Sequence, residues 1–261
     1  MSKKLTATLK LNRNDAQITL NEKLSECTNA VFFGINSLNI DIELPQSLSV
    51  DENSIFTHEP VIKMDLEASR INFNSWVLKK GFEDLIAALT ELMISFCNII
   101  DLNSKIKDSR SGTLDDFAKV IFGQNEINTK LHFPILIKKV KGSLKSPLKY
   151  NIEILTLNKV RNCLVHRNGV IHETDFNFEN GLILKWWYYD VKLKQGKRLK
   201  ELKRFDIIKP SENNIQITPV LKTKFFKRGE RIAFDFQEFN ELSHFCQSVG
   251  FDMLNKFELT I

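Results

Sequence analysis

Apolar residues recur at helical spacing in two long stretches of this 261-residue chain. In residues 73–101 and in residues 236–257 they fall mostly three or four positions apart, which predicts amphipathic helices with one apolar face each. The positions are Trp76, Leu85, Leu89, Leu92, Phe96, Ile99 and Ile100 in the first stretch, and Phe236, Phe239, Leu242, Phe245, Val249, Leu254 and Phe257 in the second.

Shorter helices are expected between these two. One is predicted over residues 134–140, and another starts near Pro147 and extends to about His166, where Gly169 is well placed to end it. A polar loop over residues 103–113 and a short helix from Asp115 precede them.

Strict alternation of apolar and polar residues predicts strands in two other regions. Residues 5–11 and 40–44 alternate near the N-terminus, on either side of a short helix predicted over residues 21–33. A strand is predicted from residue 182 onward, because apolar residues occupy alternate positions at Ile183, Trp187, Tyr189, Val191 and Leu193. A turn is expected at Gln195-Gly196, and shorter strands are expected at 207–208 and 215–221. The expected fold is mostly α, with a small α+β appendage over residues 1–70 and a helical domain over 71–261. A β insertion at about 170–233 precedes the last helix.

Composition narrows the class of protein. Gly and Pro are scarce, and 20 of the 26 aromatic residues are Phe, which favours a packed core over a turn-rich β-sandwich. The four cysteines are far apart and form no CxxC pair. No secretory signal is evident, and no apolar run approaches the ~20 residues of a membrane span. We therefore expect a cytoplasmic protein with reduced thiols and no membrane partner.

One segment, Asn158 to Gly169, combines residues that can carry chemistry. At about 100° per residue, Asn158, Arg161, Asn162 and His166 share an arc of about 140° on the predicted helix, whereas Val160, Cys163 and Leu164 lie off it. Histidine acts as a general acid or base near neutral pH, and arginine binds phosphate oxygens. Asn162 and His166 are one turn apart, so that the amide could orient the imidazole. The bland alternative is an arginine that pairs at a helix end beside an ordinary interhelical histidine.

The string Arg161-Asn162, three residues and His166, near the end of a helix in a helical context, resembles the HEPN domain signature. In that family an Arg is followed after four to six residues by a His, and the residue next to the Arg is usually polar. Arg-Asn-x-Leu-Val-His-Arg-x-Gly looks particularly like HEPN proteins of prokaryotic defence systems. The resemblance covers roughly residues 73–169 and 234–258.

The resemblance implies a bundle of four or five helices and a dimer with two Arg/His pairs in one cleft. Many family members are metal-independent ribonucleases that act as toxins or antiphage effectors, and others are inactive interaction modules. A partner antitoxin or defence protein is implied as well. Members paired with nucleotidyltransferase antitoxins often carry a Tyr two places after the His. Here that position is Asn168, so modification of such a Tyr is not expected.

A basic stretch in the β insertion is a candidate for binding RNA. Residues 192–204 hold seven basic residues and one acidic residue, and a second basic run covers residues 222–231. Aromatic residues 186–189 lie just upstream, and basic residues with neighbouring aromatics suit single-stranded nucleic acid. The predicted substrate-binding residues are Lys192, Lys194, Lys197, Arg198, Lys200 and Trp187. A solvated hairpin with one aromatic face on the bundle is the alternative.

The leading hypothesis is a metal-independent endoribonuclease in which His166 is the acid–base residue, Arg161 binds the scissile phosphate and Asn162 positions either of them. No metal-ligand spacing is evident and no cofactor is expected. A non-catalytic HEPN-like module that binds RNA or protein is the first alternative, and a helical protein with an incidental Arg/His pair is the second. One Arg/His pair supplies one acid–base group, which favours a homodimer joined near Val165 and Gly169. In a monomer, Asp84, Glu91 or a lysine would have to supply the second group.

Overall fold

The computed structural model describes residues 12–37, 66–108, 128, 130–195, 198–201 and 214–257. Within them are five α-helices, one 3-10 turn and one three-stranded sheet. The elements are α1 (Arg13–Ser37), α2 (Leu66–Asp108), α4 (Phe133–Lys141), α5 (Asn151–Arg167), η1 (Glu173–Asp175), β1 (Gly181–Gln195), β2 (Arg198–Glu201), β3 (Asn214–Lys227) and α6 (Phe236–Lys256). The mostly helical fold and the β insertion before the last helix are confirmed.

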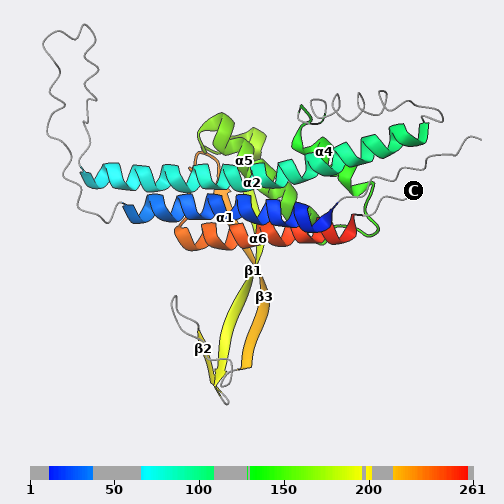
Figure 1. Cartoon of the computed structure of the whole chain (residues 1–261). Coiled ribbons are helices and arrows are strands. Elements are labelled where there is room, and N and C mark those ends of the chain that lie inside the picture. The colour runs from blue at the N-terminus through cyan, green and yellow to red at the C-terminus, as the bar shows by residue number, and fades with distance from the viewer. Residues whose placement is uncertain are drawn as a thin grey trace, which may run out of the picture.

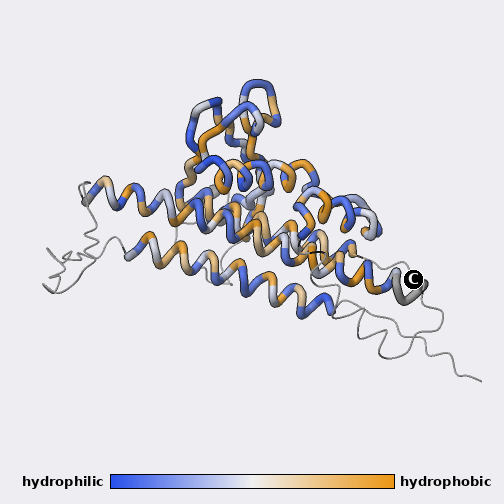
Figure 2. Tube along the Cα trace, turned by 90° about the horizontal axis from the view of Figure 1, so that it is seen from above, coloured by the Kyte–Doolittle hydropathy of each residue, from blue (hydrophilic) through white to orange (hydrophobic). Residues whose placement is uncertain are grey.

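Three long helices, α1, α2 and α6, run side by side, with α4 and α5 packed on α2 (Figure 1). α2 and α6 supply much of the core, in which Phe82, Leu89, Phe96, Phe239 and Phe245 are buried. Viewed from above, apolar and polar positions alternate along these helices at helical spacing (Figure 2). The helical faces predicted for α2 and α6 are therefore largely correct, although Trp76 is exposed.

α1 belongs to the bundle and is not part of a separate appendage. Leu20, Leu24 and Val31 occupy one side of α1 and are buried against α2 and α6. Gly81 on α2 and Gly250 on α6 allow this close approach, because a Cβ at either position would collide with Val31 or Leu20. The α+β appendage expected for residues 1–70 was wrong in this respect. Its two predicted strands, 5–11 and 40–44, lie outside the described residues.

α2 is longer and more apolar than the sequence analysis allowed. Residues 67–104 are long and apolar enough to cross a membrane by length and composition, with a mean hydropathy of 1.8 in the most apolar window. The sequence analysis expected no stretch of this kind; the core helix of a soluble protein passes the same test, so α2 does not by itself establish a membrane span. In this fold one face of α2, including Phe82, Leu85 and Met93, packs in the core of the bundle. α2 also continues to Asp108, through the first part of the predicted loop; the rest of that loop and the short helix from Asp115 lie outside the described residues.

α4 and α5 are joined by a short connection over residues 142–150. Pro134 lies in the first turn of α4, and Lys141 at its other end donates a 2.8 Å hydrogen bond to Asn151 at the start of α5. α5 begins at Asn151, four residues after Pro147, since residues 145–149 are held against α6. The backbone N–H of Lys149 donates to Asp252 (2.8 Å), and the carbonyl of Pro147 accepts from Lys256 (2.6 Å).

The C-terminal end of α5 is closed by a left-handed turn, as Gly169 suggested. Asn168 and Gly169 both have positive φ, 50° and 75°, and the Gly169 N–H donates to the carbonyl of Cys163 (3.1 Å). The N–H of Asn168 donates to the same carbonyl, five positions earlier, and this spacing is that of the long bond in a Schellman motif. The motif stops the helix directly after His166 and Arg167.

β1 and β3 form a long antiparallel hairpin that projects beyond α6, with β2 on the other edge of β1 (Figure 1). The buried side chains of β1 are Leu182, Leu184 and Trp186. These have the opposite parity to the apolar set that the sequence singled out, so the predicted strand is confirmed but its core face is the other one. The predicted strand at 207–208 lies outside the described residues.

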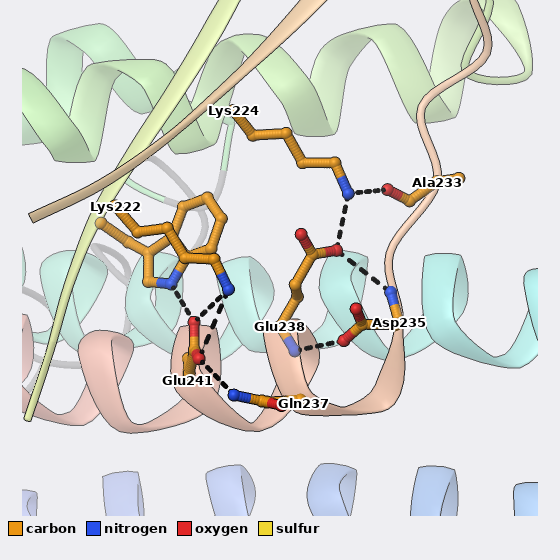
Figure 3. Close-up of polar contacts among 8 residues, drawn as sticks. Lys222, Lys224, Ala233, Asp235, Gln237, Glu238 and Glu241 are labelled. Atoms are coloured by element: carbon orange, nitrogen blue, oxygen red, sulfur yellow. Dashed lines mark hydrogen bonds and ion pairs between the residues drawn. The ribbon is translucent and has the colours of Figure 1, made fainter. Parts of the chain in front are cut away.

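Two carboxylates of α6 anchor the hairpin (Figure 3). Glu241 accepts from the buried indole of Trp186 (3.0 Å) and from Lys222 (3.1 Å), and Glu238 accepts from Lys224 (2.6 Å). Glu238 also completes a capping box with Asp235 at the start of α6. The hairpin and the last helix are thus joined through paired charges as well as apolar contacts.

Candidate active site

A pocket of about 370 Å³ lies where α2, the start of α4 and the second half of α5 meet. Its lining combines polar and apolar residues. The polar residues are Thr90, Lys130, His132, Asn158, Arg161, Asn162 and His166, and the apolar residues are Ile86, Leu131, Phe133 and Pro134.

All four residues of the predicted arc on α5 line this pocket. The opposite side of the helix, with Val160, Cys163 and Leu164, is buried in the core. Because the core fixes the rotation of α5, the arc must face outward at the junction with α2 and α4. His166 is exposed in the pocket and is not buried among phenylalanines.

Arg161 is half-buried and faces no carboxylate. Its guanidinium donates to the side-chain oxygen of Asn162 (3.4 Å), and no salt bridge to Arg161 occurs among the described residues. Asn162 therefore contacts Arg161; no hydrogen bond joins it to His166 in the described part of the chain. Of the two positioning roles predicted for Asn162, the geometry favours the one toward Arg161.

Two functional candidates in the pocket, Lys130 and His132, were missed by the sequence analysis. Both precede α4 and were read as part of a connection. They join the arc on α5 only through the packing of α4 in the folded chain, so no local sequence signal could have found them.

The pocket is positively charged. It contains Lys130, Arg161 and two imidazoles, and the described residues that line it include no Asp or Glu. Asn158, which also lines the pocket, is 7% exposed and adds a polar amide to it. The site therefore suits an anion with several oxygen atoms.

Arg167, next to His166, has the structural role that the bland alternative gave to Arg161. Its guanidinium makes a two-pronged ion pair with Asp175 of η1, in which Nε lies 2.8 Å from Oδ2. Asp175 is 1% exposed and also accepts from the backbone N–H of His172 (2.9 Å). This pair fixes the end of α5 and hence the backbone that carries His166.

The predicted RNA-binding residues of the hairpin are not brought to the pocket. The end of β1 and all of β2 lie toward the far end of the hairpin, which projects past α6, whereas residues of α2, α4 and α5 line the pocket (Figure 1). Lys192 pairs with Asp190 (2.7 Å). Side chains of Lys194, Lys197, Arg198 and Lys200 lie outside the described residues.

The aromatic quartet and the second basic run are largely structural. Trp186 is buried, and Trp187 packs against the core and donates from its indole to Glu153 on α5 (3.0 Å), so Trp187 is unsuited to stack on a base. Lys222 and Lys224 are held by Glu241 and Glu238, and Arg228 pairs with Glu173 (2.5 Å). Of the four aromatics, Tyr189 alone is exposed.

Neither Asp84 nor Glu91 lies in the pocket. Asp84 pairs with Lys80 (2.7 Å) on the same helix, and Glu91 pairs with Lys23 of α1. Among the described residues, no group of three or more His, Cys, Asp or Glu side chains could hold a metal ion. The acid–base candidates that the structure places together are His132 and His166.

The interface predicted around Val165 and Gly169 is only partly accessible. Val165 is exposed, but Gly169 is buried, and its carbonyl accepts a hydrogen bond from the backbone of Ile232 (2.8 Å). Any dimer contact at this end of α5 must therefore use Val165 and its neighbours on the helix.

Comparison with known proteins gives little guidance on the site. No family model and no solved structure matches the chain. The sperm vesicle fusion protein fer-1 of Caenorhabditis elegans is 24% identical over 174 residues, which cover 60% of this chain and 8% of fer-1. The chain thus matches less than a tenth of the length of that relative.

Proposed function

We propose that this protein is a metal-independent endoribonuclease of the HEPN type, and that the pocket on α5 is its active site. The observation that carries the proposal is the convergence of Arg161, Asn162 and His166 with Lys130 and His132 around one pocket whose described lining has no carboxylate. Such a site attracts a phosphodiester and can transfer protons near neutral pH.

The reaction class that fits is attack of a ribose 2′-oxygen on the adjacent phosphorus. Arg161, held by Asn162, would bind the non-bridging oxygens and stabilise the charge that develops on them. His166 would move a proton at the 2′-oxygen or at the leaving 5′-oxygen. The products are a 2′,3′-cyclic phosphate and a 5′-hydroxyl end.

Through the HEPN resemblance alone, the proposal includes a role as a toxin or antiphage effector that works in the cytoplasm as a homodimer. The fer-1 match is short relative to that protein and identifies no residue of the pocket, so vesicle fusion is not proposed for this chain.

The direct test is cleavage of single-stranded RNA by the purified protein with EDTA present. Wild type should cleave, and His166→Ala and Arg161→Ala should each lose about a hundredfold or more in rate. His244→Ala and Arg228→Ala are matched controls, because these residues are exposed and lie outside the pocket. Both controls should retain full activity.

Two results would contradict the proposal. If cleavage disappears on chelation and returns with magnesium, the chemistry depends on a metal site elsewhere. If wild type binds RNA tightly but never cleaves it, the non-catalytic module is the better description. Expression in a bacterial host gives a rapid check, because slowed growth should vanish with His166→Ala.

A further inference from the structure

Cleavage by transesterification needs two proton transfers, one from the 2′-hydroxyl and one to the 5′-oxygen. The sequence analysis identified one histidine, His166, for these two transfers, and it expected a second subunit to supply the second acid–base group. The pocket contains a second imidazole from the same chain, because His132 and His166 both line it from different elements.

The imidazole of His132 is available for chemistry. His132 occupies the N-cap position of α4 with extended backbone angles (φ −71°, ψ 147°), but its side chain makes no capping hydrogen bond. The carbonyl of His132 begins the helix by accepting from Ile135 (2.9 Å) and Leu136 (3.1 Å). Its backbone is therefore fixed while its exposed ring faces the pocket.

The surroundings of His132 favour a phosphate between the two histidines. The N-terminus of α4 carries partial positive charge, and Lys130 and Arg161 add two full charges to the lining of the pocket. Asn158, which is 7% exposed, contributes an amide to the same lining. A volume of about 370 Å³ is at the small end of ligand sites, which suits one phosphodiester and its flanking sugar.

We infer that His132 is the second acid–base residue of this site, and that Lys130, Arg161 and Asn158 hold the scissile phosphate between His132 and His166 within a single chain. The inference rests on the proposed ribonuclease function. One imidazole, neutral, accepts the 2′-hydroxyl proton as the 2′-oxygen forms a bond to phosphorus. The other, protonated, gives its proton to the 5′-oxygen as the bond between phosphorus and that oxygen breaks. The pair ends with the opposite protonation, and no net proton is consumed.

The first experiment measures phosphate binding without any cleavage. Inorganic phosphate is titrated into the full-length protein while histidine side-chain signals are followed by NMR. The signals of His132 and His166 should shift together and saturate at one phosphate, and that of His244 should not move. Arg161→Ala should weaken binding at least tenfold, and Arg228→Ala should not. Separate responses of His132 and His166 would overturn the shared site.

The second experiment tests the acid–base role. His132→Ala should lower kcat about a hundredfold or more, and the pH profile of kcat should lose one limb, with His166→Ala removing the other. The double variant should be little worse than either single variant, because the two groups act together. His132→Gln, which keeps a polar side chain at an exposed position, guards against misfolding and should be as inactive as His132→Ala.

The outcomes separate the two proposals. Full activity of His132→Ala and His132→Gln overturns the role of His132 and leaves the ribonuclease standing on Arg161 and His166. Absence of cleavage by wild type, with phosphate shifts intact, overturns the ribonuclease and the acid–base role together and leaves a phosphate-binding site.

Discussion

Arg161 and Arg167 lie on the same helix, but only Arg167 has a buried carboxylate as its partner among the described residues. Arg167 is bound to Asp175, a nearly inaccessible carboxylate, whereas Arg161 is held by the amide of Asn162 and faces the pocket. Sequence spacing alone could not assign these roles, since Asp175 lies beyond the end of the helix. The turn after α5 brings Asp175 back to Arg167, and this contact, which depends on the fold, distinguishes the two arginines.

The ion pair between Arg167 and Asp175 should contribute measurably to stability. Asp175→Asn leaves a partly buried guanidinium without a counter-charge, and we expect the free energy of unfolding to fall by about 3 kcal/mol. Glu173→Gln is the control, because its partner Arg228 is 70% exposed and such pairs contribute at most about 1 kcal/mol. Urea denaturation of both variants checks the difference; equal losses would contradict it.

The pKa values of the buried thiols predict how the free energy of unfolding changes at alkaline pH. Burial, the largest cause, raises the pKa of Cys27 to about 12 and those of Cys97 and Cys163 to about 11, from 9.0. Because the folded protein retains these protons longer than the unfolded chain, their contribution to stability is complete below about pH 9 and is lost as pH rises toward 11–12. The free energy of unfolding under reducing conditions should therefore decrease from pH 9 to pH 11.

Cys163→Ala provides the control for that measurement. It should be less stable than wild type near neutral pH, since Cys163 is buried, but should lose less stability between pH 9 and pH 11. An unchanged alkaline slope would contradict the assignment to Cys163.

At the level of helices and strands, hydrophobic periodicity predicted whether a segment is a helix or a strand better than it predicted which elements that segment packs against. α4 and α6 were found close to their observed bounds because each has a clear apolar face, whereas the end of α5 was found from Gly169. The role of α1 was missed because its apolar positions are sparse and gain their partners only from α2 and α6. The arc on α5 was predictable from the helical angle alone, but Lys130 and His132 join it through the packing of α4, which no local pattern encodes.

The two faces of β1 show a second limit of sequence patterns. Both parities of β1 are apolar over its first half, so alternation could not decide which one meets the helices. The other face continues on β3 as Ile215, Ile217, Leu221 and Phe225, all exposed. Apolar residues therefore cover the outside of the hairpin as well as its anchored side.

This assignment of faces can be tested by paired truncations. Leu184→Ala should lower the free energy of unfolding by about 2–5 kcal/mol, because Leu184 is fully buried. Ile217→Ala, on the exposed face, should change it by about 0.5 kcal/mol or less. Thermal or urea denaturation measures both, and a reversed order would mean that the faces are exchanged.

At the level of the whole molecule, Arg161, His132 and His166 of one chain line the same pocket, and this arrangement bears on whether the proposed reaction requires a dimer. A dimer would not have to complete the acid–base pair if His132 supplies the second group. Mixtures of Arg161→Ala and His166→Ala chains should then regain no activity beyond that of the separate variants. Recovery toward wild-type rates, with the mixed dimer verified by mass spectrometry, would mean that residues of opposite subunits share a site.

Removing the outer hairpin should separate RNA affinity from chemistry. Asp190 and Thr218 are paired across β1 and β3, so an Asn-Gly turn can replace residues 191–217 without disturbing Trp186 or its partners. This deletion removes the basic stretch, and we expect weaker RNA binding with a flatter salt dependence but an unchanged rate at saturating RNA. Replacing Lys197, Arg198 and Lys200 with Ala should give the same trend, and unchanged affinity in both would exclude the hairpin from RNA binding.

The hairpin leaves and re-enters the bundle at adjacent positions, because Gly181 and Lys227 are paired at its base. β1 alone is 15 residues long, about 45 Å at strand spacing, yet its contacts with the helices are concentrated near its first half. A segment attached in this way can be lengthened, shortened or exchanged as one block while the helices keep their places. If the proposed ribonuclease function holds, this architecture would let the bundle acquire a new target preference by replacing the hairpin, with no change to the residues of the pocket.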